Sequence, residues 1–297
     1  MKEIHYRKID AFAVDRSSGN PAGVVHLNKG QALTETEMQE IAKGQKGIVS
    51  EVVFCTPLDT DLYELKYYSS ECEVEFCGHA TIACMYDLIK NEPAVSNRKS
   101  VMIRTCKGDL PVINDISNSD SVFITAPVPE YLSCSLSKAE IAQNLNINDD
   151  SIANNFQLAL INGGLRTLLV PISSLNRIIN IRPDQISLEC FCRNNNFDII
   201  LVFSTEVFNK VNAFRTRVFA PKYGYLEDPA TGSGNSAFGY YLLQKKLWDG
   251  EIISIEQGPS VEYPNMVKLK TVSSDVTQRV LFGGNGIVKY IEKIELA

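Results

Sequence analysis

Long hydrophobic runs are missing from this sequence. No apolar stretch in the 297 residues approaches the roughly 20 residues that a membrane-spanning helix needs. The first residues, Met1 to Arg7, also lack the apolar stretch of a secretion signal. We therefore expect a cytoplasmic protein with no membrane partner.

An excess of positive charge is missing as well. The chain has 29 Lys and Arg against 35 Asp and Glu, a net charge of −6. A negative balance disfavours binding to nucleic-acid phosphates, so we expect no nucleic-acid partner. The 44% hydrophobic and 22% charged residues are typical of a globular protein, and the length is enough for two domains of ordinary size.

Cysteine is plentiful, but the spacing typical of a structural zinc site is absent. Most of the eight cysteines lie in apolar runs, where a free thiol behaves as a small hydrophobic side chain. One group of potential ligands lies close together in the sequence: Cys72, Cys77, His79 and Cys84. It lacks the short C-x2-C pairs of structural zinc sites. The sequence therefore predicts no metal site.

A glycine turn followed by an apolar, helix-length run organises the C-terminal half. Residues 228 to 236 read Asp-Pro-Ala-Thr-Gly-Ser-Gly-Asn-Ser. Gly232 and Gly234 permit another group to approach the backbone closely. We expect Ser233 or Asn235 to cap a helix that begins near Ser236. The N–H groups at such a helix start are suited to bind a carboxylate.

The same pattern occurs nearer the N-terminus, where residues 77 to 83 read Cys-Gly-His-Ala-Thr-Ile-Ala. When Gly78 is aligned with Gly232, His79 falls on Ser233. Strand-like runs also precede both turns, at 49–55 and 62–68 in the first copy and at 197–203 and 213–219 in the second. We interpret the chain as two similar domains and expect the two turns to face one another across a cleft.

The predicted domain boundary is the stiff connector Pro127-Val-Pro129. It gives domains of residues 1–127 and 128–297, with the last strand, about 287–297, as a candidate to pack back on the first domain. Capping boxes that start at Thr34 and Ser137 predict a helix after each.

Two polar side chains in the N-terminal half are candidates for function. Glu51 interrupts the apolar strand 48–54, so it lies either on a solvated face or in a cleft, where it can serve as a base. Asn20 lies in the turn-rich segment 15–21, where it contacts a substrate amide or bonds its own backbone. The residues alone leave both pairs of alternatives open.

Four segments together resemble the PhzF-like family, which is named for the phenazine-biosynthesis isomerase. They are Asp-Ala-Phe-Ala-Val-Asp-Arg-Ser-Ser-Gly-Asn-Pro-Ala-Gly-Val-Val at 10–25, Ser-Glu-Val-Val-Phe at 50–54, Phe-Cys-Gly-His-Ala-Thr at 76–81 and Glu-Asp-Pro-Ala-Thr-Gly-Ser at 227–233. The resemblance runs over essentially the whole chain. It implies an α/β protein of the diaminopimelate-epimerase fold, with two pseudo-symmetric domains that each wrap an antiparallel sheet around a central helix. It also implies a homodimer that uses no metal or organic cofactor.

The namesake enzyme isomerises trans-2,3-dihydro-3-hydroxyanthranilate by moving a hydrogen from C3 to C1. Such a reaction needs a group that takes and returns a proton, and donors that hold the substrate carboxylate. Carried over by motif, Glu51 is the acid and base, and His79 and Asp228 position and polarise the substrate. The groups that hold the carboxylate belong to Gly78, Gly232 and Ser233.

Sister families of this fold, the diaminopimelate epimerases and proline racemases, use two opposed cysteines. Cys77 lies where one of these thiols is expected, but the second copy has no cysteine at its glycine turn, so a two-thiol racemase does not fit. Two alternatives stay open: a single-base amino-acid racemase or epimerase, and a non-catalytic small-molecule-binding protein of the same fold. Asn235 departs from the small residues common in the family and leaves the substrate identity open.

Overall fold

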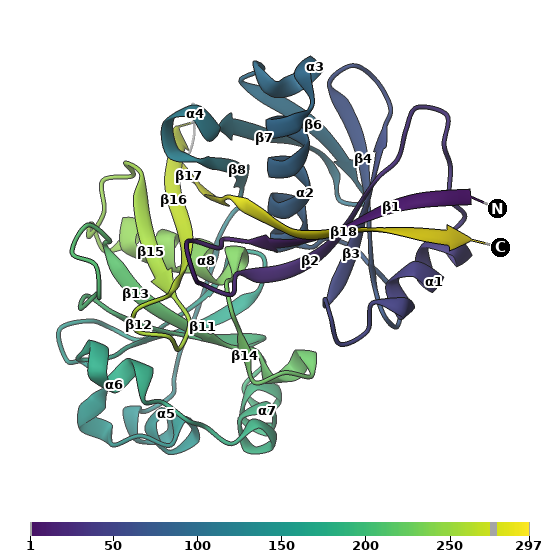
Figure 1. The fold of residues 1–297 in the computed structure, drawn as a ribbon. Coiled ribbons are helices and arrows are strands. Elements are labelled where there is room, and N and C mark those ends of the chain that lie inside the picture. Colours follow the sequence, from purple (N-terminus) through teal and green to yellow (C-terminus); the bar gives the residue numbers. More distant parts are fainter. Residues whose placement is uncertain (1, 274–277, 297) are drawn as a thin grey trace. The chain divides into compact units, whose positions relative to one another are not determined.

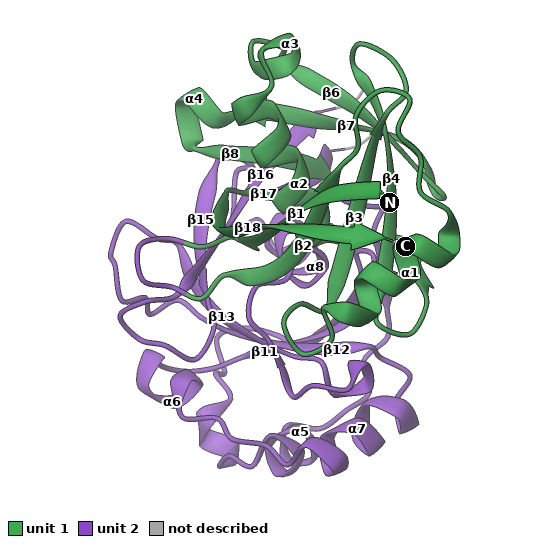
Figure 2. Ribbon diagram, turned by 45° about the vertical axis from the view of Figure 1, so that its right-hand side comes forward, with its two compact units in different colours: residues 1–13, 18–125, 283–297 green, residues 14–17, 126–282 purple. Residues whose placement is uncertain are grey.

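The computed structural model describes residues 2–273 and 278–296, and the chain divides into two compact units (Figure 1, Figure 2). Unit 1 comprises residues 1–13, 18–125 and 283–297, and unit 2 comprises residues 14–17 and 126–282. The C-terminal strand pairs with the N-terminal strand inside unit 1. The predicted domain bounds, 1–127 and 128–297, stay a prediction.

In its described part, unit 1 contains one sheet and four helices. Its strands are β1 (Lys2–Ala11), β2 (Asn20–His26), β3 (Glu51–Pro57), β4 (Leu62–Ser69), β5 (Glu73–Val74), β6 (Ser100–Thr105), β7 (Gly108–Asp115), β8 (Ser121–Thr125) and β18 (Gly286–Leu296). Its helices are α1 (Glu35–Gly44), α2 (Gly78–Asn91), α3 (Pro93–Ser96) and α4 (Ile116–Ser119). The strand order is β18-β1-β2-β3-β4-β6-β7-β8. The short strand β5 pairs with the C-terminal part of β4, which β6 does not cover. The β2–β3 and β4–β6 pairs are parallel and the others are antiparallel.

Unit 2 has the same plan. Its strands are β9 (Glu130–Leu132), β10 (Ala159–Asn162), β11 (Arg166–Pro171), β12 (Ile199–Ser204), β13 (Phe214–Phe219), β14 (Glu227–Asp228), β15 (Ile253–Gln257), β16 (Asn265–Ser273) and β17 (Gln278–Gly284). Its helices are α5 (Lys138–Leu145), α6 (Leu175–Ile179), α7 (Gln185–Asn194) and α8 (Gly232–Gln244), with single 3-10 turns at Asp149–Ser151 and Pro221–Tyr223. The strand order is β9-β10-β11-β12-β13-β15-β16-β17, and β14 pairs with β13.

The repeat predicted from the sequence is confirmed by the strand pairing. In unit 2 the parallel pairs are β11–β12 and β13–β15, which occupy the same places as β2–β3 and β4–β6 in unit 1. The short strands β5 and β14 both pair with the strand before the glycine turn. Each unit is therefore a mostly antiparallel sheet with two parallel pairs at equivalent positions.

A buried helix lies at the centre of each unit. Helix α2 contacts β1, β2, β3, β8 and β18, and α8 contacts β10, β11, β12 and β16. Both helices are apolar around most of their circumference, as expected for helices enclosed by a sheet. None of the helices in the described residues is long and apolar enough to cross a membrane.

The two predicted capping boxes are confirmed. Thr34 Oγ1 accepts from the Glu37 N–H at 3.2 Å, and Glu37 Oε2 accepts from the Thr34 N–H at 2.7 Å. Ser137 and Glu140 exchange the same two bonds at 3.2 and 2.8 Å. These bonds satisfy N–H groups that the first turns of α1 and α5 leave without a helical partner.

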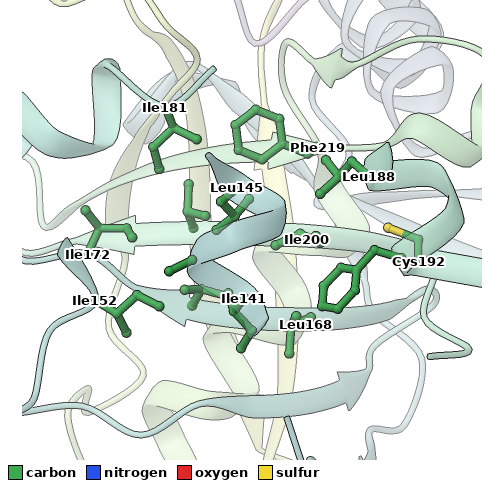
Figure 3. Packing of buried hydrophobic residues seen from close by; sticks show 14 of the residues in the cluster. Ile141, Leu145, Ile152, Leu168, Ile172, Ile181, Leu188, Cys192, Ile200 and Phe219 are labelled. Carbon is green, nitrogen blue, oxygen red and sulfur yellow. The ribbon is translucent and has the colours of Figure 1, made fainter. Parts of the chain in front are cut away.

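The sheet of unit 2 has an apolar cluster on the face away from α8 (Figure 3). Alternate strand residues such as Leu168 and Ile200 meet side chains of α5 and α7, including Leu145 and Leu188. On the opposite face, Phe203 packs against Phe238 of α8, with 4.6 Å between ring centroids. The two faces of this sheet therefore pack against different helices.

Candidate active site

The structure brings three proton-carrying side chains together in unit 1. Glu51 is the first residue of β3, Cys77 precedes α2, and His79 is the second residue of α2. Glu51 Oε2 lies 3.4 Å from His79 Nε2 and 3.7 Å from Cys77 Sγ. Cys77 Sγ lies 3.3 Å from His79 Nδ1. The Glu51 and His79 side chains are 22% and 12% exposed, so solvent reaches both only partly.

The start of α2 is tied to the sheet that carries Glu51. Thr81 Oγ1 donates to the Cys77 carbonyl at 2.7 Å, and Tyr67 on β4 shares a hydrogen bond of 2.7 Å with Thr81. Burial raises the pKa of Tyr67 well above its ordinary value, so its hydroxyl stays protonated. Ser50 Oγ donates to Glu51 Oε2 at 2.5 Å. Local packing thus fixes the position of the carboxylate relative to the helix start.

The second glycine turn is held by a polar network inside unit 2. Asp228 Oδ2 accepts from Thr231 Oγ1 at 2.5 Å. Gln257 on β15 donates to the Asp228 carbonyl at 2.9 Å and accepts from the Thr231 N–H at 3.0 Å. The sequence predicted a functional role for Asp228 but none for Thr231. Gln257 is far away in the sequence, and no local pattern identifies it.

The two central helices begin in nearly the same way. Their N-cap residues, Cys77 and Thr231, have φ and ψ of −131° and 111° and of −123° and 112°. Within the described chain, neither N-cap side chain makes a capping hydrogen bond. The first N–H groups of both helices are therefore not used by a side-chain cap.

The predicted helix start near Ser236 with a cap at Ser233 or Asn235 is wrong. Helix α8 begins at Gly232, so these residues all lie in its first turns. Asn235 is fully buried and donates to the Thr231 carbonyl at 2.9 Å and to Gln257 Oε1 at 2.7 Å. Ser236 Oγ donates back to the Gly232 carbonyl at 2.8 Å. These tertiary and local bonds hold a turn-forming sequence in a helix.

The expected close approach at Gly232 is confirmed. A Cβ built there would lie 2.4 Å from two ring carbons of Phe282 on β17. Ser233 is half-buried beside the turn at Gly164, whose ideal Cβ would lie 3.5 Å from that of Ser233. A larger residue at position 232 would therefore displace the start of α8.

Asn20 is not a loop residue, because β2 begins with it. The turn-rich segment 15–21, which we expected to be a loop, therefore ends two residues earlier, before Asn20. Asn20 is buried, and it begins β2 just as Glu51 begins the neighbouring parallel strand β3. The two residues consequently lie toward the same end of this strand pair.

The sequence group of potential zinc ligands is divided by the fold. Cys72 is exposed, with its Sγ 3.9 Å from Ser69 Oγ. Cys77 and His79 lie beside Glu51, whereas Cys84 is fully buried beside His26 and Cys55. The helix separates these side chains because Cys77 and Cys84 lie two turns apart.

Two surface hollows lie away from these residues. One, of about 280 Å³, is lined by residues of β4, β5 and β6, and the other, of about 460 Å³, by residues of α5, α6 and the turn after α5. Among the described residues, neither lining includes Glu51, His79, Asp228 or Ser233. The juxtaposed acid–base groups identify the candidate site better than the size of a hollow.

Several proteins are similar to this chain in sequence. A protein named as an uncharacterized isomerase from Clostridium acetobutylicum is 27% identical, covering 100% of this chain and 99% of the relative. Another uncharacterized isomerase, from Bacillus subtilis, is 28% identical over 91% of each chain. A Schizosaccharomyces pombe protein named antisense-enhancing sequence 1 is 27% identical over 96% of each.

Solved structures show the same fold. A Bacillus anthracis phenazine biosynthesis protein of the PhzF family superposes with a TM-score of 0.87 over 100% of both chains, at 22% identity. A probable proline racemase from Agrobacterium radiobacter has a TM-score of 0.62 over 99% of this chain and 93% of its own, at 12% identity. The expected diaminopimelate-epimerase-like fold is thereby confirmed. A family model described as phenazine biosynthesis-like protein matches residues 9–290, so this chain belongs to the PhzC-PhzF family.

Proposed function

We propose that this protein is an isomerase that shifts a proton on a small carboxylate-bearing substrate, with Glu51 as acid and base. The observation that carries the proposal is the 3.4 Å approach of Glu51 Oε2 to His79 Nε2 at the start of α2. The names of the relatives from Clostridium and Bacillus, both isomerases, support the reaction class. A substrate similar to trans-2,3-dihydro-3-hydroxyanthranilate has the activated C–H bond and the carboxylate that this chemistry needs.

In the proposed reaction Glu51 removes a proton from the substrate, holds it, and returns it to another carbon on the same face. Partial exposure of Glu51 gives the substrate access and also lets the proton that it holds exchange with water before it is returned. His79 stabilises the charge that develops on the substrate, and Cys77 contacts both groups. These proton-transfer steps use only side chains of this protein.

We assign binding of the substrate carboxylate to groups at the starts of α2 and α8. In unit 1 the N–H groups around Gly78 bind negative charge, supported by the dipole of the 14-residue helix α2. In unit 2 the same role is assigned to Gly232 and to the half-buried Ser233. The first N–H groups of both helices suit a carboxylate because the N-cap side chains do not form hydrogen bonds with them.

Two further residues are assigned to substrate positioning. Asp228 positions and polarises the substrate. The hydrogen bond from Thr231 fixes the orientation of its carboxylate for this role. Asn20 contacts a polar group of the substrate, consistent with its place at the start of the strand beside β3.

We also propose that the protein forms a homodimer, as the family resemblance implies. Strand β18 exposes three apolar side chains, Val288, Tyr290 and Ile291. In unit 1 it pairs with β1 along one side. Light scattering coupled to size-exclusion chromatography measures the mass directly, and a monomer at micromolar concentration would contradict this part of the proposal.

One observation favours a second candidate reaction, a single-base amino-acid racemase or epimerase. Cys77 Sγ lies 3.3 Å from His79 and 3.7 Å from Glu51, so this thiol offers an alternative to Glu51 as the one base. Such an enzyme would exchange the α-hydrogen of an amino acid and change its chirality. A chiral assay of the product separates this reaction from a shift of the proton between carbons.

The test is to follow trans-2,3-dihydro-3-hydroxyanthranilate by ultraviolet absorption and proton NMR. Glu51→Gln should lower turnover by about 10² to 10⁴, because it removes the general base while keeping the shape of the side chain. The matched control is Glu64→Gln, which changes a half-buried carboxylate on the neighbouring strand β4 and should keep wild-type turnover. Turnover by Glu51→Gln at the wild-type rate would refute the assigned role. A wild type that binds the compound without converting it would instead favour the non-catalytic binding protein.

A further inference from the structure

A second group of potential metal ligands lies in unit 1, apart from the Glu51 site. His26 on β2, Cys55 on β3 and Cys84 on α2 place one ligand atom each within 4.8 Å of one another. His26 and Cys55 are direct partners across the parallel β2–β3 pair, and α2 packs against both strands. Both cysteines are almost completely buried. The proposed isomerisation uses none of these three side chains.

The His26 ring is oriented by a buried carboxylate. His26 Nε2 lies 3.0 Å from Asp87 Oδ2, and Arg7 Nη1 donates to the same oxygen at 2.7 Å. Among the described residues, the buried Nδ1 of His26 has no hydrogen-bond partner. In the neutral ring that donates from Nε2 to Asp87, Nδ1 carries a lone pair, and a buried acceptor of this kind needs a partner. A metal ion would be such a partner.

We propose that His26, Cys55 and Cys84 bind one zinc ion, with Asp87 as the group that orients His26. Zinc prefers nitrogen and sulfur ligands, and metal-bound histidines commonly donate their other N–H to a carboxylate. Two thiolates, one neutral imidazole and Zn²⁺ carry no net charge together, and Arg7 neutralises Asp87. A neutral assembly is the least costly way to bury these groups.

The distances between the three ligand atoms are compatible with a zinc ion. Zinc bonds of about 2.0–2.3 Å in a tetrahedron hold the ligand atoms roughly 3.3–3.8 Å apart. Small side-chain rotations bring atoms that lie within 4.8 Å to that separation. The three side chains supply three of four tetrahedral positions, and a water molecule or small anion would complete the set. The His26 side chain is 21% exposed, so the group can be reached from the surface.

The experiment is a titration of the reduced, metal-depleted full chain with Co²⁺ under anaerobic conditions, followed by displacement with Zn²⁺. Wild type should bind one equivalent and show thiolate-to-cobalt charge-transfer absorption that zinc removes. Cys55→Ser and Cys84→Ser should weaken binding by at least about 100-fold, and Asp87→Asn by about 10- to 100-fold. Cys192→Ser is the matched control, because Cys192 is equally buried in unit 2, and it should bind as wild type does.

One further variant separates this group from the Glu51 site. Glu51, Cys77 and His79 also lie within 4.8 Å of one another, so Cys77→Ser is measured in parallel. Absence of charge-transfer absorption in wild type would overturn the proposal without any variant. It would also be overturned if Cys77→Ser lost the metal while Cys84→Ser kept it. Circular dichroism establishes that each variant is folded, and failure of the isomerase assay has no bearing on these readouts.

Discussion

Replacing Gly232 by alanine should destabilise unit 2. The new Cβ would lie 2.4 Å from the Phe282 ring, well inside the carbon contact distance of about 3.5–4.0 Å. Phe282 is only 4% exposed, so its ring cannot turn away into solvent. Overpacking costs about 1–3 kcal/mol, which exceeds the roughly 0.5–1 kcal/mol that replacing a helical glycine contributes. We expect a net loss of about 1–2 kcal/mol in the free energy of unfolding.

The matched control is Gly44→Ala in α1. Gly44 is also helical, and a Cβ built there meets no described atom within 4 Å. This variant should be as stable as wild type or more stable by up to about 1 kcal/mol. The contrast between the two glycines isolates the steric effect from helix propensity.

Urea unfolding measures both variants. The sequence has one tryptophan, Trp248 in unit 2, whose fluorescence reports on the unit that contains Gly232, and circular dichroism reports on both units. Phe282→Leu should relieve part of the Gly232→Ala loss in a double-mutant cycle. Unfolding of Gly232→Ala at the wild-type urea concentration, or a cycle without coupling, would refute the steric argument.

Three further predictions concern stability in unit 2. Ser137→Ala removes the oxygen that caps α5 and should cost about 1 kcal/mol in urea unfolding, whereas an unchanged midpoint would show that the capping bond is not stabilising. Leu145→Ala empties part of the cluster in Figure 3 and should cost about 2–5 kcal/mol, so a loss below about 1 kcal/mol would mean that the site collapses. Hydrogen bonds from Ser187 lower the pKa of Asp184, so its stabilisation is complete above the unfolded-state pKa of about 3.9 and is lost as the pH falls through the folded-state value. Asp184→Asn keeps a capping oxygen and should flatten the acidic limb of stability below about pH 4, and an unchanged slope would contradict this.

Local patterns predicted most of the fold. Thr34 with Glu37 and Ser137 with Glu140 identified two helix starts, because a capping box is complete within four residues. The repeated order of strands, glycine turn and apolar helix predicted the duplication that the strand pairing shows. Such features need no knowledge of distant contacts.

The errors arose where distant contacts decide the structure. The start of α8 was placed too late because Gly-Ser-Gly-Asn is typical of a turn, whereas Gln257 on β15 holds Asn235 inside the helix. The group of His26, Cys55 and Cys84 comes from three separate elements, and no spacing in the sequence marks it. Glu51 and His79 were predicted to act together and are adjacent, whereas their chemical roles stay predictions.

The central claim is that Glu51 carries the proton, and deuterium exchange tests it most directly. Wild type, Glu51→Gln and Glu64→Gln are incubated in D₂O with dihydro-hydroxyanthranilate and a panel of amino and hydroxy acids, and deuterium uptake is measured by mass spectrometry. The account predicts uptake into a carbon-bound position with wild type and Glu64→Gln, and a rate about 10² to 10⁴ lower with Glu51→Gln. Equal uptake with wild type and Glu51→Gln would contradict it.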